Sequence, residues 1–278
     1  MPNLLLNSQR QLRNGWWILI FFLVLAMLLL PTILQAQKNS MDVSIGVQVM
    51  IIALTSLICQ LLRRESLVEL WGKFDARWLK ELFIGGLIGS ALMLIPAFVL
   101  AIFGLVEWRW NPEGISVLLP SLSLFAGVAV AEELLFRGFV FQRLISGVGQ
   151  WIAQLSMAAY FLLTHLNNPG MTGSIKVMAS LNIFLASILF GLAFIRTRSL
   201  AMPLGLHWMA NWVQGGILGF GVSGTEQSGL LMPTFGDAPI WLTGGQFGLE
   251  ASLPGLICIV IMLLVVYMMK PIAINGEV

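Results

Sequence analysis

Two histidines and an adjacent pair of glutamates are the residues of this chain whose types and placement could do chemistry. The chain contains only two histidines, and both of them, His165 and His207, lie within apolar segments. Glu132 and Glu133 interrupt another apolar segment, and Arg137 follows four residues after the second glutamate. An ionisable side chain at membrane depth is costly and usually marks a functional site. We therefore expect acid–base or water chemistry at a buried membrane site.

Helical spacing divides these residues into pairs. Glu133 and Arg137 would lie one turn apart on a helix and can form an ion pair. Glu132 would be rotated by about 100° from Glu133, which leaves it free for chemistry. His207 and Asn211 are also four residues apart and would share one helix face. The simpler alternatives are glutamates that reach water at the membrane interface and histidines that are hydrogen-bonded core residues.

The composition is that of an integral membrane protein. Hydrophobic residues make up 58% of the chain and charged residues 10%, and several apolar runs approach the roughly 20 residues that cross a bilayer as a helix. We predict an all-α, polytopic membrane helical bundle of about eight transmembrane helices, forming a single membrane domain over residues 1–278. The expected spans are residues 15–35, 44–62, 82–106, 116–137, 150–166, 177–195, 200–221 and 251–270.

One expectation concerns the fourth span and another the third. If the fourth span continues to about residue 146 and turns at residues 147–149, Glu132 lies about 14 residues before the turn and His165 about 15 after it. Both residues would then be about 21–23 Å from the turn and therefore level with each other. A second local pattern, Gly85-x-x-x-Gly89, predicts a close contact between helices in the third span.

The basic residues predict the orientation in the membrane. With a cytoplasmic N-terminus, only Lys38, Arg109 and Lys176 fall outside, and the remaining twelve of the fifteen Lys and Arg residues fall inside. The positive-inside rule therefore places both termini in the cytoplasm. We expect a multi-pass protein of a bacterial plasma membrane, with the lipid bilayer as a partner and no nucleic-acid partner. Residues 223–249 contain no Lys or Arg, and we expect them on the outer face without a catalytic role.

Three motifs in a fixed order resemble one family. They are Glu-Glu-x-x-x-Arg at 132–137, Phe-x-x-x-His at 161–165 and His-x-x-x-Asn at 207–211. This order resembles the CPBP family of intramembrane proteases, also called Abi or type II CAAX prenyl endopeptidase-like. The resemblance covers residues 115–222, which we take as the motif-bearing catalytic core. It implies a CAAX prenyl endopeptidase-like intramembrane protease, with a cavity open to the cytoplasm in which a peptide bond of a peptide or membrane-anchored protein is hydrolysed.

The resemblance and general chemistry together suggest a role for each residue. Glu132 with His165 would activate a water molecule as a general base. His207 and Asn211 would stabilise the oxyanion of the tetrahedral intermediate. Structural support of this site would come from Glu133, Arg137 and Phe161.

A divalent metal is compatible with the same residues. Glu132, His165 and His207 could form a zinc site of two histidines and one glutamate that leaves a position open for water. A metal-free glutamate mechanism is also compatible, and the usual zinc-protease motif His-Glu-x-x-His is absent from the sequence. We slightly favour the metal, which would make the enzyme a metalloprotease.

Two other classes of function are considered. Buried Glu, His and Arg also form proton relays in proton-coupled transporters, but we find no inverted repeat and no symmetric pair of broken helices. A non-catalytic bacteriocin immunity or partner protein could keep the same fold, but the intact motifs argue against it.

Overall fold

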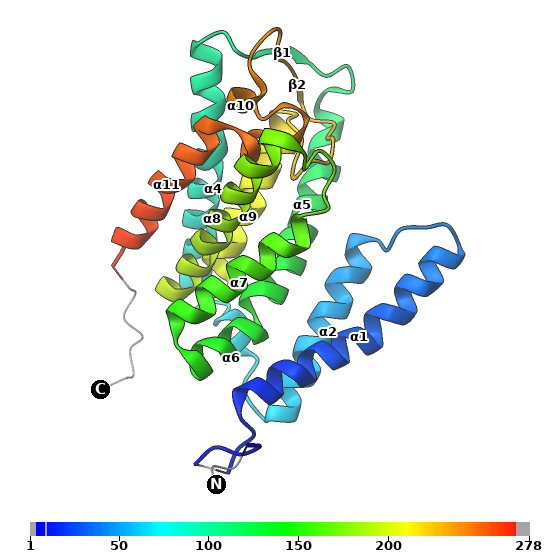
Figure 1. Cartoon of the computed structure of the whole chain (residues 1–278), viewed down its shortest axis with the longest axis vertical. Coiled ribbons are helices and arrows are strands. Elements are labelled where there is room, and N and C mark those ends of the chain that lie inside the picture. Colours follow the sequence, from blue (N-terminus) through cyan, green and yellow to red (C-terminus); the bar gives the residue numbers. More distant parts are fainter. Residues whose placement is uncertain (1–3, 9, 271–278) are drawn as a thin grey trace.

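Apolar segments of the chain fold into long helices that lie side by side in the computed structural model, which describes residues 4–8 and 10–270 (Figure 1). The long helices are α1 (Asn14–Lys38), α2 (Ile45–Arg63), α4 (Ala76–Ile102), α5 (Leu118–Arg137), α7 (Gln150–His165), α8 (Gly173–Thr197), α9 (Ala201–Asn211) and α11 (Leu253–Met268). Shorter helices are α3 (Val68–Trp71), α6 (Phe139–Val148) and α10 (Ile240–Thr243).

Five helical segments among the described residues are long and apolar enough to cross a membrane. They are Asn14–Lys38, Ile45–Arg63, Val68–Ile102, Gly114–Val148 and Gly173–Thr197. Inside a bilayer, helices satisfy their own backbone hydrogen bonds, which explains why these segments are mainly helical, with breaks at residues 72–75 and at Gly138. The prediction of a polytopic helical membrane protein is confirmed.

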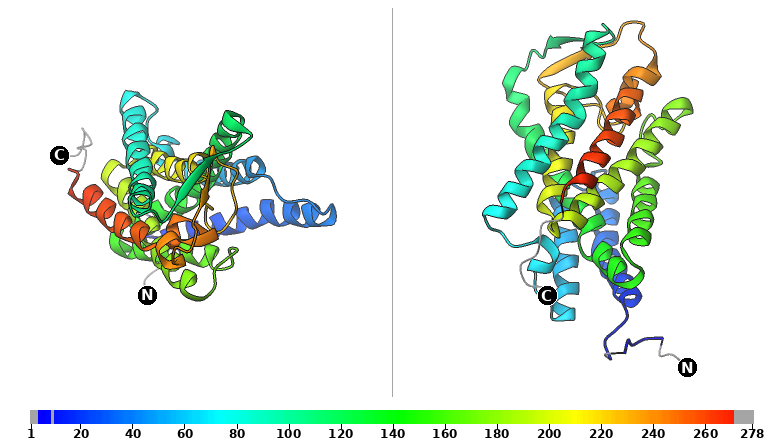
Figure 2. Two further views of the ribbon diagram at one scale, coloured as in Figure 1. Left: turned by 90° about the horizontal axis from the view of Figure 1, so that it is seen from above. Right: turned by 90° about the vertical axis from the view of Figure 1, so that its left-hand side faces the viewer.

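The connections at one end of the bundle contain the extended structure (Figure 2). Strands β1 (Glu107–Trp110) and β2 (Leu231–Thr234) pair antiparallel, with Glu107 opposite Thr234. Three 3₁₀ turns, η1 (Gly114–Val117), η3 (Gly245–Phe247) and η4 (Leu249–Ala251), lie in the same connections. The N-terminal segment lies at the other end of the bundle (Figure 1).

The fourth predicted span is not one continuous helix to residue 146, so this expectation was wrong. Helix α5 ends at Arg137, Gly138 leaves the helical conformation with φ −73° and ψ −125°, and α6 begins at Phe139. A Cβ atom on Gly138 would lie 2.2 Å from the carbonyl oxygen of Leu134, which only glycine avoids. The break turns α6 out of the line of α5, as Figure 1 shows.

Glycines hold α4 against α9, as the Gly85-x-x-x-Gly89 spacing predicted. A Cβ atom on Gly85 would lie 2.1 Å from the carbonyl oxygen of Met202, and one on Gly89 would lie 2.1 Å from that of Leu206. Gly205 on α9 makes the reciprocal approach, because its Cβ would lie 2.0 Å from the carbonyl oxygen of Leu82. The two backbones are therefore in direct contact, as at small-residue helix interfaces in membranes.

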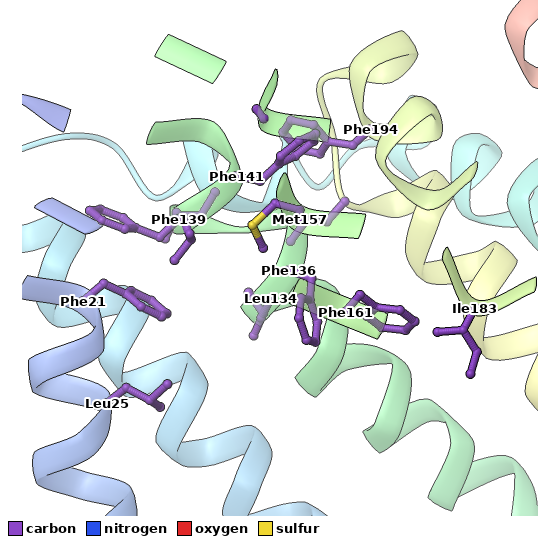
Figure 3. Packing of buried hydrophobic residues seen from close by; sticks show 14 of the residues in the cluster. Phe21, Leu25, Leu134, Phe136, Phe139, Phe141, Met157, Phe161, Ile183 and Phe194 are labelled. Carbon is purple, nitrogen blue, oxygen red and sulfur yellow. The ribbon is translucent and has the colours of Figure 1, made fainter. Parts of the chain in front are cut away.

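Two buried apolar clusters complete the packing. One joins α1, α5, α6, α7 and α8, and in it the rings of Phe21 and Phe139 stack 5.6 Å apart (Figure 3). The other surrounds α9 and includes Leu206 and Ala210, which lie on either side of His207 in the sequence. Apolar contacts thus hold α9 in place independently of its polar contacts.

A six-residue π-helix, η2 (Trp212–Ile217), continues directly from α9. Its two glycines are tightly packed, because a Cβ atom on Gly215 would lie 2.7 Å from the Phe125 ring and one on Gly216 would lie 2.6 Å from the Ser121 hydroxyl. A π-turn holds one residue more than an α-turn and often occurs beside functional sites.

Candidate active site

A cavity of about 500 Å³ brings the sequence-predicted residues together. Its walls come from α2, α5, α7, α8 and α9 and from residues 222–227. The predicted residues that line it are Glu132, Phe161, His165, His207 and Asn211. Glu133 and Arg137 are fully buried behind this wall.

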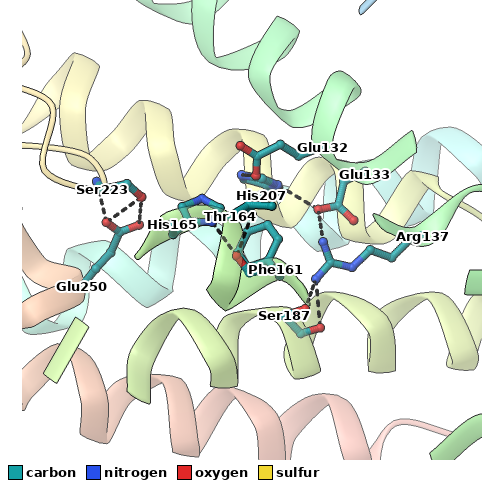
Figure 4. A network of polar contacts seen from close by, with 10 residues as sticks. All are labelled: Glu132, Glu133, Arg137, Phe161, Thr164, His165, Ser187, His207, Ser223 and Glu250. Carbon is teal, nitrogen blue, oxygen red and sulfur yellow. Dashed lines mark hydrogen bonds and ion pairs between the residues drawn. The ribbon is translucent and has the colours of Figure 1, made fainter. Parts of the chain in front are cut away.

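The buried network behind the wall is built on Glu133 (Figure 4). Its Oε1 atom lies 3.2 Å from Arg137 NH1, which confirms the pairing suggested by their spacing, and 2.8 Å from Nδ1 of His207. Arg137 also donates to the backbone oxygen of Ser187 at 3.0 Å and to its hydroxyl at 2.8 Å. The bond between Glu133 and His207 was not predicted, although it fixes the orientation of the imidazole ring.

Aromatic rings enclose the same network. The guanidinium carbon of Arg137 lies 5.1 Å from the ring centroids of both Phe161 and Phe190, within the range of cation–π attraction. Phe190 stacks on His207 with centroids 4.7 Å apart and planes 10° apart. Phe161 lies 4.4 Å from the His165 ring. These rings exclude water from the buried charges and keep both imidazoles in place.

Glu132 differs from its neighbour in both exposure and partners. Its side chain is 26% exposed and lines the cavity, whereas that of Glu133 is 1% exposed. Oε2 of Glu132 lies 3.8 Å from Nε2 of His207, which is an ion-pair distance but too long for a hydrogen bond. One glutamate is therefore held in a structural network, and the other faces the cavity.

The backbone sets the tautomer of His165. Its Nδ1 lies 2.7 Å from the carbonyl oxygen of Phe161, one turn earlier on α7. A carbonyl oxygen only accepts hydrogen bonds, so Nδ1 must carry the proton, and in the neutral ring Nε2 keeps its lone pair. Thr164 donates to the same carbonyl oxygen at 2.8 Å. His165 can therefore act through Nε2 as a base.

Residues 223–249, for which no catalytic role was predicted, contribute to the wall of the cavity. Ser223, Thr225 and Gln227 line the cavity, together with Glu250, the residue that follows this segment. Figure 4 shows Glu250 beside His165, on the far side from Glu132. Neither the periodicity nor the motifs of the sequence single out these residues.

Glu250 holds a tight turn over the cavity. Its carboxylate accepts hydrogen bonds from the backbone nitrogen of Ser223 at 2.6 Å and from the Ser223 hydroxyl at 3.1 Å. The side chain of Asn168 donates to the Ser223 carbonyl oxygen at 2.9 Å. Ser223 has a φ of +49°, which is unusual for a residue with a side chain and is held by these contacts. Burial raises the pKa of the Glu250 carboxyl above its usual range.

The three residues expected to bind zinc do not form a ready metal site. Among residues 4–8 and 10–270, no group of three or more His, Cys, Asp or Glu side chains lies close enough to hold a metal ion. Both histidines form hydrogen bonds through Nδ1, His207 with Glu133 and His165 with the Phe161 carbonyl, so a metal would have to bind through Nε2. Glu132, His165 and His207 would have to move closer together to share a zinc ion, and zinc binding stays a prediction.

Nucleophilic catalysis by cysteine finds no support in the structure. Cys59 and Cys258 are free and buried, and neither lines the cavity. Burial raises the pKa of a thiol, and the thiolate is the reactive form. Both cysteines are therefore packing residues.

The fold and the site together define a class: a polytopic helical membrane protein with a polar cavity in which glutamate and histidine side chains meet. Residues 112–213 match a family model described as Type II CAAX prenyl endopeptidase Rce1-like. This segment contains all three motifs, and the match confirms the resemblance inferred from them. Searches of curated proteins and of solved structures gave no significant match.

Proposed function

We propose that this protein is an intramembrane endopeptidase that hydrolyses a peptide bond in the cavity. The observation that carries the proposal is the division between the two adjacent glutamates. Glu133 is neutralised by Arg137 and bonded to His207, whereas Glu132 faces the cavity. A partly exposed carboxylate that lies 3.8 Å from the His207 ring and lines the same cavity as His165 has the groups required for water activation.

In the proposed reaction, Glu132 takes a proton from a water molecule while the water oxygen attacks the carbonyl carbon of the substrate. His165 accepts a hydrogen bond from the same water through Nε2, because its Nδ1 is bound to the Phe161 carbonyl. When the C–N bond breaks, Glu132 returns the proton to the leaving nitrogen. General acid–base catalysis of this kind contributes roughly 10²–10⁴-fold in rate.

His207 and Asn211 are proposed to stabilise the oxyanion. Glu133 accepts the proton of His207 Nδ1, so Nε2 donates to an oxyanion only when the ring is an imidazolium. The carboxylates of Glu132 and Glu133 both favour that charged form. One oxyanion donor is worth about 10²–10³-fold in rate in other enzymes.

The cavity walls suit a peptide without acidic side chains near the scissile bond. Two carboxylates, Glu132 and Glu250, line the cavity, and within the described chain no Lys or Arg lines it. Like charges that meet in a confined site repel each other strongly. We propose a peptide or a segment of a membrane-anchored protein as the substrate. Analysis of the cleavage products shows whether that substrate carries a prenyl group.

The orientation in the membrane is a further part of the proposal. We propose eight spans, in which α7, α9 continued by η2, and α11 join the five longer segments. The positive-inside rule then places the starts of α1, α4, α7 and α9 in the cytoplasm. Ser223 and Gln227 line the cavity from a connection at the opposite end. The positive-inside rule therefore places this wall of the cavity at the outer face. It argues against the cytoplasmic opening that the resemblance implies, and that opening stays a prediction.

A proton-coupled transporter is a less well supported function. Its relay would need a group that takes up and releases protons along a path across the membrane. Glu133 and Arg137 are instead locked in a network with Ser187, and that network is enclosed by aromatic rings. An immunity or partner protein would not need the division between the two glutamates.

The deciding experiment compares the termini of proteins in the membrane fraction of host cells that express wild type or Glu132→Gln. New termini that appear only with wild type would establish proteolysis and identify the substrate. Asp42→Asn is the matched control, because it removes one exposed carboxylate that does not line the cavity. Identical termini in all three strains, with a wild-type phenotype lost only in Glu132→Gln, would refute proteolysis.

The metal is tested separately on the purified protein. Activity that is lost on chelation and restored by zinc would support a metalloprotease. Activity that survives exhaustive chelation would support the metal-free mechanism.

A further inference from the structure

A second and larger cavity, of about 1000 Å³, lies at the end of the bundle where the chain begins. Its walls come from residues 4–19, from the end of α2 and from the end of α6. It shares no lining residue with the candidate active site. None of the proposed catalytic chemistry uses it.

Arginines give this cavity a positive charge. Arg13, Arg63 and Arg143 line it, and Glu65 is the acid among the lining residues. Glu69 lies behind the wall and pairs with Arg63 at 3.1 Å and with Arg143 at 2.6 Å. Three guanidinium groups therefore face two carboxylates, which leaves a positive charge for a ligand to neutralise.

Arg143 carries an unsatisfied donor at this cavity. The residue is 6% exposed, and its NH2 group is bonded to Glu69. Its Nε atom is buried and has no hydrogen-bond partner among the described residues. A buried donor without a partner is destabilising, so the described residues leave the guanidinium of Arg143 incompletely paired.

Apolar side chains form part of the remaining wall, beside the polar side chains of Asn7, Gln11, Asn14 and Ser146. The apolar residues include Trp16, Trp17, Leu19 and Leu62. Tryptophans at helix ends typically lie at the headgroup level of a bilayer. A cavity with arginines on one wall and apolar side chains on another suits an amphiphile with an anionic head.

We propose that this cavity binds the phosphate-bearing headgroup of an anionic phospholipid, with the acyl chains along α1 and α2. Basic pockets between transmembrane helices at the cytoplasmic face bind such headgroups in other membrane proteins. The charge rule places this end of the bundle at that face. The proposal does not depend on whether the protein is a protease.

Binding is measured on the purified full chain in detergent, by native mass spectrometry and by thermal shift, with phosphatidylglycerol, phosphatidylcholine and inorganic phosphate as separate probes. Phosphatidylglycerol should bind saturably and more tightly than phosphatidylcholine. Arg13→Gln should weaken its binding about fivefold, from roughly 1 kcal/mol per interfacial arginine. Arg143→Gln should weaken it further, because a buried charge is screened less.

Lys80→Gln is the matched control, because it removes one exposed positive charge from the same end of the bundle without touching the cavity. Its affinity for phosphatidylglycerol should equal that of wild type. Arg13 is exposed, so its variant tests the proposal even if Arg143→Gln fails to fold. Equal binding of both lipids, equal losses in Arg13→Gln and Lys80→Gln, or the same thermal shift with inorganic phosphate alone would overturn the proposal.

Discussion

Replacing Arg137 by methionine should expose the energetic cost of the buried network. Methionine fills a similar volume and packs against the same aromatic rings, but it carries no charge. Glu133 would then be 1% exposed with its ion-pair partner gone, while its Oε2 atom already lacks a partner among the described residues. Its remaining bond would be to His207.

The size of the effect follows from these contacts. Removing one partner of a buried ion pair typically costs about 3–5 kcal/mol, because the other charge is left uncompensated. The two bonds from Arg137 to Ser187 are lost as well, and the Ser187 hydroxyl and carbonyl are left inside the protein. We therefore expect a loss near the upper end of that range. The double variant Arg137→Met with Glu133→Gln should lose at least ~1 kcal/mol less stability than the two single variants lose in sum, since contacting residues couple by about 0.5–3 kcal/mol.

The free energy of unfolding is measured in mixed micelles titrated with a denaturing detergent, for both single variants and the double variant. Arg109→Met is the control, because Arg109 is exposed on β1 and surface substitutions usually stay within about 0.5 kcal/mol. If Arg137→Met costs no more than this control, or if the two single losses simply add, the network does not stabilise the fold and the reasoning is wrong.

Three further predictions concern other parts of the molecule. Gly89→Ala should cost about 1–3 kcal/mol of stability and reduce activity by displacing α9. Gly46→Ala is the control and should be neutral or stabilising, because a Cβ there meets nothing within 4 Å. Unfolding and activity assays compare the two variants, and equal effects would contradict the backbone contact. The pKa of the Glu250 carboxyl is raised in the fold. The stabilisation by its protonated form is therefore complete at a pH below the ordinary pKa of about 4.3, and it is lost as the pH rises through the raised pKa. The wild type should therefore lose stability over this window relative to Glu250→Gln in melting curves, and the opposite slope would refute the burial argument. In intact cells Glu226→Cys should react with a membrane-impermeant thiol reagent and Lys80→Cys should not; the reverse pattern would place the loop end of the cavity in the cytoplasm.

The helical architecture was predictable because lipid imposes simple rules on a sequence. Apolar runs of sufficient length identify spans, and each predicted span overlaps a helix of the structure. The break at Gly138 was not predictable from periodicity, since the apolar pattern continues through it. At this break the Gly138 backbone lies so close to the Leu134 carbonyl oxygen that no Cβ atom fits, a local detail of the backbone that hydrophobic periodicity does not encode.

The site was predictable only where its residues are rare or regularly spaced. Glu133 and Arg137 are paired by helical spacing, and the histidines stand out because the chain has two. The bond between Glu133 and His207 joins residues 74 positions apart, and helical spacing says nothing about such a distance. Glu250 lies in a polar connection of the kind that usually faces solvent, and only tertiary packing brings it beside His165.

The π-helix after α9 determines how this protein can tolerate change in length. His207 and Asn211 precede η2, while the turn at Ser223 follows it. A π-turn is equivalent to one residue inserted into an α-helix, so deleting one residue from Trp212–Ile217 would restore an α-helix without moving the histidine or the asparagine. The residues beyond the deletion would also keep their orientation, because the wider π-turn already absorbs the extra residue, and Ser223 would stay beside Glu250. The segment is thus a place where the chain can lose one residue while His207, Asn211 and the turn at Ser223 keep their relative positions.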